Sequence, residues 1–459
     1  MLFFEANVKD NLKPWPRVER YQNSTLRFTP GEDFPGHLEK MIGRPKIMRT
    51  FITLNDAWDF RSDEYHYDYV IGKDIYADDP LVDGYDRDES KLSPYGLTFL
   101  QYLKSHAAHA DYLMFSVRRY EREVIDGWLS IDKYEEVLEH LLEYYKEIVP
   151  NLRYVEGNET NYVQFGNISA FETYELYKRM YRIVNRLNKK HNYEIPLEVG
   201  GPTYADSKTK FWQYEHFMRL YLLDRDPEKR LDFYATHEYT TDMNFLPELY
   251  RKHKDLVKRM GLPEVPMMFN EYGVTDGCTP DPQYNQLNAA GSIEIMIALS
   301  PYDDFIVFPW CSYHDPSIQV DRTQYIDFNR TCGYLPTFLG QAYIALSKLL
   351  DDSIPLTGNI GNRAVLTTDG TDYALLATNR DDKMHNLRFA LTNLDCSKVK
   401  VDVYQVDAMH NNCFIDKTVE NLQCTDSFEA EVSEGKLKIS DTLDARGFTL
   451  WMIHPMKAE

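Results

Sequence analysis

Two glutamates in this chain each follow an asparagine at the end of an apolar run. Glu159 ends the run LRYVEGNE, and Glu271 ends the run VPMMFNE. Cleavage of a glycosidic bond needs two such carboxyl groups, one neutral enough to protonate the leaving oxygen and one ionised enough to attack or to activate water. Either glutamate taken alone is explained as well by a salt bridge or a helix cap. The predicted strands and helices that position the two glutamates are therefore needed to choose between these interpretations.

Short apolar runs alternate with longer amphipathic ones over 41–350, which is typical of parallel strands connected by helices. The clearest helix begins at Ser130, carries its apolar residues on one stripe and ends before Pro150. We expect strands around residues 47, 113, 152–156, 195–199, 231, 265 and 306. Units of this length, repeated over about 300 residues, favour a closed (β/α)8 barrel, or TIM barrel. An open doubly wound sheet is the alternative, but no glycine-rich phosphate-binding loop follows any of these strands.

A different pattern follows the helix that we expect over 335–350. Short alternating strands are separated by Asp, Asn and Gly turns: NRAVLTT, DYALLATNR, LRFALTN, VKVDVYQV, KLKIS and FTLWMIHP. They predict a small accessory β-sandwich at the C-terminus. The strand-like early residues, including TLRFTPG, precede the first barrel strand that we predict, at residue 47. We therefore predict N-terminal strands over 1–40 that pack with the sandwich, a catalytic barrel over 41–350 and the sandwich over 351–459.

Barrel enzymes take their reactive groups from the C-terminal ends of the strands and the loops that follow them. Reading off these ends gives Glu159, Asn270 and Glu271 as candidates. The residues that we expect to bind the substrate are Arg49, Asn55, Arg118, Asn158, His237, Tyr239, Trp310 and Tyr313. Arg118 carries a guanidinium of the kind that binds a carboxylate in bidentate fashion, which would suit a uronate sugar. A surface position or a helix cap is the alternative for this residue.

Several short motifs around the two glutamates resemble a known family. The stretch YVEGNETNY over 154–162 is similar to the acid/base signature on strand four of the clan A glycoside hydrolases, and MMFNEYG over 267–273 is similar to their nucleophile on strand seven. LEVGGPTYA and HEY lie between them in the expected order, and a sandwich follows the barrel. This arrangement most resembles glycoside hydrolase family 39, the β-xylosidase and α-L-iduronidase family, from Lys46 to the end of the chain.

The resemblance implies roles for individual residues. Glu159 corresponds to the general acid/base and Glu271 to the nucleophile, so that the anomeric configuration is retained. Asn158 is implied to bind the sugar hydroxyl next to the anomeric carbon. Tyr239 matches a strand-six tyrosine that touches the nucleophile, and His237 lies on the same side of that strand.

Further expectations concern the surroundings of the two carboxyl groups. A nucleophile must stay ionised, so we expect donors near Glu271, with Arg49 and Tyr239 as candidates. The acid must start protonated, so we expect Glu159 in a less polar wall or close to the charge of Glu271. The resemblance also implies that Trp310 offers a stacking platform for the sugar.

The sequence departs from the family pattern at three positions. The acid/base motif usually has a tryptophan before the Asn-Glu pair and a proline after it, whereas Gly157 and Thr160 stand here. The first barrel strand of the xylosidases carries an Arg-Gly-His motif, and the corresponding MRTFIT has Arg49 but Phe51 in place of the histidine. These changes alter the wall of the sugar site and put the xylosidase assignment in doubt.

Composition and charge exclude other classes of function. The chain has 51 Lys and Arg against 72 Asp and Glu, a formal net charge of −21, which repels nucleic acid and anionic membranes. The N-terminus MLFFEANVKDN lacks a signal-peptide pattern and no run is long and apolar enough for a membrane span, so we expect a cytoplasmic protein. His106 and His109 do not form an HExxH motif, and we expect no metal. Catalysis by two carboxylates needs no cofactor.

These observations predict a retaining glycoside hydrolase that acts from the chain end on short oligosaccharides or small glycosides. A transglycosidase on the same scaffold and a non-catalytic carbohydrate-binding protein are the alternatives. The expected partner is a carbohydrate substrate, and the resemblance favours a homo-oligomer.

Overall fold

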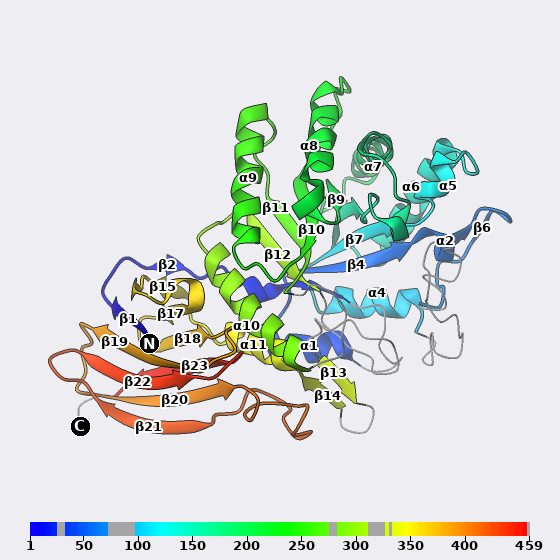
Figure 1. Cartoon of the computed structure of the whole chain (residues 1–459). Helices are drawn as coiled ribbons and strands as arrows, with labels where there is room; N and C mark the ends of the chain where they lie inside the picture. Colours follow the sequence, from blue (N-terminus) through cyan, green and yellow to red (C-terminus); the bar gives the residue numbers. More distant parts are fainter. Residues whose placement is uncertain (25–32, 72–96, 275–281, 311–325, 330–332, 457–459) are drawn as a thin grey trace.

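The computed structural model of the chain describes residues 1–24, 33–71, 97–274, 282–310, 326–329 and 333–456. Figure 1 shows a sheet of strands covered by helices, with further layered sheets at the C-terminal end of the chain. The predicted α/β barrel with a C-terminal β-sandwich is confirmed.

Eight parallel strands form the barrel. In chain order they are β3 (Tyr21–Asn23), β4 (Ile47–Thr53), β7 (Tyr112–Arg118), β8 (Leu152–Gly157), β9 (Glu198–Tyr204), β10 (Phe233–Tyr239), β11 (Met267–Gly273) and β12 (Phe305–Pro309). Each strand pairs with the next one along the chain, as β/α units require. The strand that we predicted at residue 47 is therefore the second barrel strand, because Tyr21–Asn23 precede it.

Side-chain hydrogen bonds complete the barrel where β3 meets β12. The Asn23 side-chain amide donates to the carbonyl of Asn270 at 2.6 Å and to the carbonyls of Phe308 and Pro309 at 3.3 Å each. Asn23 itself is fully buried. One short strand therefore connects the first and last parts of the barrel through its last residue.

Helices alternate with the strands and cover the barrel. They are α1 (Phe34–Ile42), α4 (Phe99–Ala108), α6 (Ile131–Ile148), α7 (Ala170–His191), α8 (Ser207–Leu223), α9 (Phe245–Met260), α10 (Pro282–Leu299) and α11 (Phe338–Ser347). The helix predicted after Ser130 is α6: the Ser130 hydroxyl accepts a hydrogen bond from the Lys133 N–H, and one stripe is buried. A capping box of Ser169 and Glu172 begins α7 in the same way.

Short elements lie in the connections. They are α2 (Leu54–Ala57), α5 (Glu121–Ile125), the 3-10 helices η1 (Val18–Arg20), η2 (Val163–Phe165) and η3 (Gly361–Arg363), and two hairpins, β5 (Trp58–Asp59) with β6 (Glu64–Tyr65) and β13 (Ile326–Asn329) with β14 (Gly333–Pro336). Two of them, α2 and α5, follow directly on strands β4 and β7 at the end where a barrel carries its site.

Two sheets pack face to face in the sandwich. The smaller one has β16 (Thr357–Gly358), β1 (Leu2–Asn7), β19 (His385–Thr392) and β22 (Leu437–Leu443) in that order. The larger one has β2 (Lys13–Pro14), β15 (Asp352–Ile354), β17 (Ala364–Thr368), β18 (Tyr373–Thr378), β23 (Phe448–Pro455), β20 (Lys398–Val406) and β21 (Asp426–Glu431). Their common core includes Phe4, Phe389 and Trp451.

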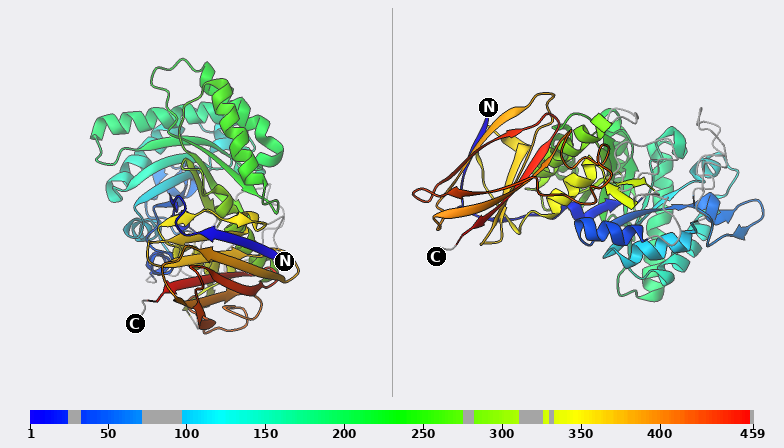
Figure 2. Two further views of the ribbon diagram at one scale, coloured as in Figure 1. Left: turned by 90° about the vertical axis from the view of Figure 1, so that its left-hand side faces the viewer. Right: turned by 90° about the horizontal axis from the view of Figure 1, so that it is seen from below.

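The first strand of the chain thus lies inside the C-terminal sandwich, as both views of Figure 2 show. The stretch TLRFTPG, which we also assigned to this layer, lies outside the described residues. The boundaries at residues 40 and 350 stay a prediction, with Tyr21–Asn23 belonging to the barrel sheet. Within the part of the chain that the structure describes, no helix has the length and apolar character of a membrane span.

Candidate active site

A layer of polar side chains lies inside the barrel, above an apolar floor. The floor includes Ile47, Met114, Tyr154, Ala235 and Met268. Because side chains of a strand alternate between its two faces, residues two positions further along point into the same interior. These are Arg49, Ser116, Glu156, His237 and Asn270, and all are fully buried. The strands thus bring together at one depth residues that are far apart in the sequence.

Arg49 is the centre of this layer. Its Nε donates to Glu156 at 2.6 Å, and its Nη1 donates to Glu271 at 2.6 Å and to Asn23 at 3.1 Å. Its Nη2 donates to Ser116 at 2.8 Å and to Asn158 at 2.9 Å. Nη2 also lies 3.3 Å from the His237 Nε2, so the five N–H groups of the guanidinium face six protein acceptors.

Arg49 therefore differs from our expectation that it contacts the substrate. Its side chain has no exposed surface, and its N–H groups are engaged by protein acceptors. Burial lowers the pKa of Arg49, but the charges of Glu156 and Glu271 outweigh burial and raise it. Arg49 is a permanent cation that orients the residues around it.

Glu271 accepts hydrogen bonds on both of its oxygens. Arg49 donates to Oε1, and the Tyr239 hydroxyl donates to Oε2 at 2.9 Å. Both donors are those that we expected from the sequence. The Glu271 side chain is 8% exposed, whereas Arg49 beneath it is not exposed at all. The carboxylate therefore lies at the upper edge of the polar layer, with one side towards the mouth of the barrel.

Glu159 lies directly after β8 in a strained backbone conformation. Its φ of 45° is unusual for a residue other than glycine, and its N–H donates to the Thr203 carbonyl at 2.9 Å. The side chain is 12% exposed. Burial raises the pKa of Glu159 to about 7, against the opposing charges of Arg49 and Arg118. A carboxyl group with this pKa is largely protonated in mildly acidic solution.

The two glutamates face each other across His237. One carboxylate oxygen of Glu159, one of Glu271 and a ring nitrogen of His237 all lie within 4.8 Å of one another. The His237 Nδ1 is 2.8 Å from Glu159 Oε1 and 3.5 Å from Glu271 Oε2. Sequence motifs on strands β8, β10 and β11 are thus brought to one point.

The hydrogen bonds of His237 assign its tautomer. Its Nε2 lies 3.3 Å from the Arg49 Nη2, which can only donate, so Nε2 must accept. The proton of the neutral ring is then on Nδ1, which donates to Glu159. Burial lowers the pKa of His237 to about 4, although the charge of Glu271 opposes this, and the ring is neutral at pH 7.

The same tautomer bears on metal binding by Glu159, His237 and Glu271. A metal at Nδ1 would need this nitrogen deprotonated, and the proton would move to Nε2, where it would face an N–H of Arg49. The hydrogen bonding therefore disfavours a metal ion there. A second group, Glu143, Glu147 and His191, lies between α6 and α7, where Glu143 already contacts Lys190 and His191. That no metal is needed stays a prediction.

Asn158 presents its amide group to the site. Its Oδ1 accepts from Arg49 at 2.9 Å and from Ser116 at 3.3 Å. The oxygen end is thereby fixed towards the barrel interior, which turns the N–H₂ end away from Arg49. A donor in this position suits a hydroxyl group of a ligand.

An aromatic wall completes the site on the side of β4 and β12. The Trp310 ring stands edge-on to Phe51, with ring centroids 5.7 Å apart. The backbone N–H of Trp310 donates to the Tyr272 carbonyl at 2.9 Å. The guanidinium carbons of Arg49 and Arg118 each lie 4.6 Å from the Phe51 ring centroid. Phe51, which replaces the histidine of the xylosidase motif, is therefore packed between two cations and an indole.

The remaining predicted substrate-binding residues are Arg118, Asn55 and Tyr313. Arg118 is nearly buried and donates to Thr53 Oγ1 at 3.2 Å. Asn55 lies in α2, and among the described residues no hydrogen bond joins it to Glu159 or Glu271. Tyr313 lies outside the described residues.

Three members of the polar layer were not among the predicted site residues. They are Glu156 and Ser116, which bind Arg49, and Asn23, which binds both Arg49 and the carbonyl before Glu271. The alternation along each strand carried a signal for the first two, because each lies two positions before a predicted site residue on the same face. Glu156 precedes Asn158, and Ser116 precedes Arg118.

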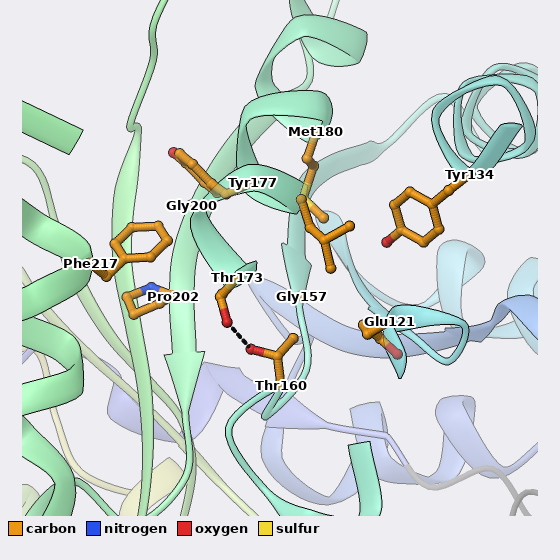
Figure 3. Close-up of a pocket in the computed structure, with 11 residues that line it drawn as sticks. Glu121, Tyr134, Gly157, Thr160, Thr173, Tyr177, Met180, Gly200, Pro202 and Phe217 are labelled. Atoms are coloured by element: carbon orange, nitrogen blue, oxygen red, sulfur yellow. Dashed lines mark hydrogen bonds between the residues drawn. The ribbon is translucent and has the colours of Figure 1, made fainter. Parts of the chain in front are cut away.

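A small cavity lies behind the Glu159 loop, between strands β8 and β9 and helices α5 to α8 (Figure 3). It encloses about 20 Å³, enough for roughly one water molecule. Thr160, next to Glu159, is hydrogen-bonded there to Thr173 at 2.8 Å. Burial raises the pKa of Glu121, which also lines the cavity, to about 8. The acid/base candidate is thus anchored from behind by α7.

Solved structures that match the chain include glycoside hydrolases. A monomeric β-xylosidase from Caulobacter crescentus CB15 matches with a TM-score of 0.70 at 13% identity over 100% of both chains. A glucosidase from Croceicoccus marinus matches with a TM-score of 0.67 at 14% identity over 100% of both chains. A bacterial orthologue of human α-L-iduronidase matches with a TM-score of 0.68 at 11% identity over 100% of this chain and 84% of the other. No protein-family model and no curated protein sequence matches the chain.

These matches establish the fold of the whole chain. A GH39 enzyme from Xanthomonas axonopodis pv. citri also matches, with a TM-score of 0.66 at 14% identity over 99% of this chain and 97% of the other. The predicted resemblance to family 39 is therefore confirmed at the level of the fold.

Glu121, which lines this cavity, should make the stability of the protein depend on pH. The pKa of Glu121 is about 8 in the folded chain against an ordinary 4.5, so between these values the unfolded chain releases a proton that the native chain keeps. The free energy of unfolding therefore falls as pH rises through this window. We expect Glu121→Gln to reduce this fall between pH 5 and pH 8 by about 2 kcal/mol or more, measured by urea unfolding. An equal fall in the free energy of unfolding of the wild type and the variant would show that Glu121 does not have this raised pKa.

Proposed function

We propose that the protein is a retaining glycoside hydrolase, with Glu159 as general acid/base and Glu271 as nucleophile. The observation that carries this proposal is the approach of the two carboxyl groups to within 4.8 Å at the mouth of the barrel. Retaining enzymes hold their carboxyl groups about 5–5.5 Å apart, whereas inverting enzymes separate them by about 6.5–9.5 Å to admit water. The short separation supports retention, because in retaining enzymes the second carboxylate attacks the sugar directly and forms a covalent intermediate.

In the first step Glu271 attacks the anomeric carbon as the bond to the leaving oxygen breaks. The leaving oxygen takes the proton of Glu159, whose raised pKa keeps a proton available below about pH 7. Arg49 and Tyr239 hold the two oxygens of Glu271 and so fix the direction of attack. The product of this step is a glycosyl ester on Glu271.

In the second step Glu159, now ionised, accepts a proton from water as the water oxygen attacks the anomeric carbon. The ester bond breaks and Glu271 returns to a carboxylate. The N–H₂ of Asn158 is directed to bind the sugar hydroxyl next to the reacting carbon. His237 Nδ1–H donates to Glu159 at 2.8 Å and so stabilises its ionised form. The proton balance closes on the two glutamates alone, and no cofactor takes part.

The substrate is proposed to be a small glycoside or a short oligosaccharide cleaved from its end. Solved structures with the same fold include β-xylosidases and a glucosidase, which supports this class. The apolar Phe51 beside Trp310 gives this site a wall that differs from the xylosidase pattern. We therefore propose the glycosidase class without assigning the sugar.

Hydrolysis of a panel of 4-nitrophenyl glycosides tests the function. The panel contains β-xyloside, β-galactoside, β-glucoside, β-mannoside, α-L-arabinosides and a uronide. We expect Glu271→Ala to lose at least about 1,000-fold in kcat on the sugar that is cleaved. Glu159→Ala should keep part of the activity, because nitrophenolate leaves with little help from an acid. Azide should rescue Glu159→Ala by replacing water in the second step.

Two results would contradict this proposal. One is a wild-type protein that cleaves no member of the panel while sugars still raise its melting temperature, which would favour a carbohydrate-binding protein. The other is full activity in Glu271→Ala. Product analysis with an added sugar acceptor separates hydrolysis from transglycosylation in the same assay.

The pH dependence gives a separate test of Glu159. Protonation of this residue is needed for the first step, and its pKa is about 7, so kcat/KM should fall above about pH 7. The fall should be clear with an alkyl glycoside, whose leaving group needs the acid, and should disappear in Glu159→Ala assayed on the 4-nitrophenyl glycoside. The same basic limb in the variant would assign the titration to another group.

A further inference from the structure

The barrel interior holds a third carboxylate that the two-step reaction does not use. Glu156 lies on β8, three residues before Glu159, and has no exposed surface. The side chains of Glu159 and Glu271 are 12% and 8% exposed, so they reach the mouth and Glu156 does not. Any influence of Glu156 on a sugar must therefore pass through other residues.

The contacts of Glu156 lead to Glu271 by two routes. Its Oε1 accepts from Arg49 Nε at 2.6 Å, and Arg49 Nη1 donates to Glu271. Its Oε2 accepts from the Asn270 side chain and from Thr203 Oγ1 at 3.0 Å. Asn270 is the residue directly before Glu271, so the carboxylate of Glu156 holds both the cation beside the nucleophile and the backbone that carries it.

Thr203 extends these contacts to the acid/base residue. Its hydroxyl donates to Glu156, and its carbonyl accepts from the N–H of Glu159 at 2.9 Å. Both Thr203 and Glu159 have positive φ values, 54° and 45°. A conformation of this kind is costly for residues with a side chain and persists only where the surroundings fix it. Glu156 is therefore bonded to the supports of both candidate catalytic residues.

The charges of this layer depend on Glu156 as well. Arg49 is one permanent cation, and it lies between two carboxylates, Glu156 and Glu271. Without Glu156, the charge of Arg49 would be offset by Glu271 alone and would act more strongly on Glu159, whose pKa it already lowers. A buried ion pair that loses one member is expensive, because the remaining charge has no water to solvate it.

We propose that Glu156 is a positioning residue of the site, which aligns Glu271 through Arg49 and Asn270 and keeps the positive charge of Arg49 from ionising Glu159. The inference rests on the proposed function, because the effect of Glu156 on activity can be measured only if the protein cleaves a glycoside. Glu156 itself is not proposed to contact the substrate.

The variant Glu156→Gln tests the proposal with little change of shape. An amide at this position keeps an oxygen for Arg49, and its new N–H₂ group would point at Asn270. The Asn270 Oδ1 is buried without a hydrogen-bond partner within the described part of the chain, so a half-turn of that amide provides the acceptor. The Thr203 hydroxyl, which donates to the same oxygen of Glu156, can turn to accept from the new N–H₂ group. The variant thus removes the charge and leaves each of these groups with a hydrogen-bond partner. Glu238→Gln is the matched control, because Glu238 is a buried carboxylate on β10 that accepts from the Lys208 N–H on the outer side of the barrel.

We expect Glu156→Gln to lower kcat by about 10- to 100-fold with KM changed by no more than about twofold, because misplacement affects the reacting geometry rather than binding. The basic limb of kcat/KM should move to lower pH by about half a unit or more, as the charge of Arg49 acts on Glu159. Glu238→Gln should keep the wild-type kcat and the wild-type pH profile. The double variant Glu156→Gln, Asn270→Asp returns a negative charge to the same pair and should move the basic limb back towards the wild-type pH.

Two results would overturn the inference. One is a Glu156→Gln protein with the wild-type kcat and basic limb. The other is a loss of activity that matches the fraction unfolded in a thermal melt while the pH profile is unchanged, since that would be a purely structural role. If the wild-type protein cleaves no glycoside, the proposed function has failed, and carbon-13 NMR of the glutamate carboxyl groups then decides on Glu156. An unchanged titration of Glu159 in Glu156→Gln, identified by its loss in Glu159→Gln, would reject the proposal.

Discussion

The structure depends on how a buried guanidinium is neutralised inside the barrel. Arg49 has no exposed surface, so each of its N–H groups must find an acceptor in the protein. Five strands provide these acceptors, from Asn23 on β3 to Glu271 on β11. Folding of the barrel therefore places Glu271 against Arg49 without the help of a ligand.

The two candidate catalytic carboxyl groups lie in different environments. Glu271 accepts from a cation and a phenol, which suits a group that must stay ionised. Glu159 lies against a buried wall after a strained turn, where burial raises its pKa to about 7. Neutral His237 bridges the two and adds no charge of its own. The two carboxyl groups thus differ in environment although they lie close together.

Much of this arrangement was accessible from the sequence. Apolar runs that end in Asn-Glu predicted Glu159 and Glu271 at the ends of two barrel strands, and the structure brings an oxygen of each to within 4.8 Å of the other. The sequence did not reveal Tyr21–Asn23 as a barrel strand, because three residues are too short to show a period and their pairing depends on β4. The sequence predicted Arg49 as a donor to Glu271 but did not reveal its complete burial, since burial of a strand-end arginine depends on residues from other strands. The predicted sandwich strands were confirmed because each carries its own alternating pattern, whereas the place of Leu2–Asn7 between β16 and β19 is a long-range pairing.

The central claim is that Glu271 forms a covalent bond to the sugar. Incubation with the activated 2-deoxy-2-fluoro derivative of the preferred glycoside, followed by peptide mapping by mass spectrometry, tests it most directly. The account predicts one added fluoroglycosyl group on the peptide that contains Glu271. A label on another carboxylate, or turnover with inversion and no label, would contradict it.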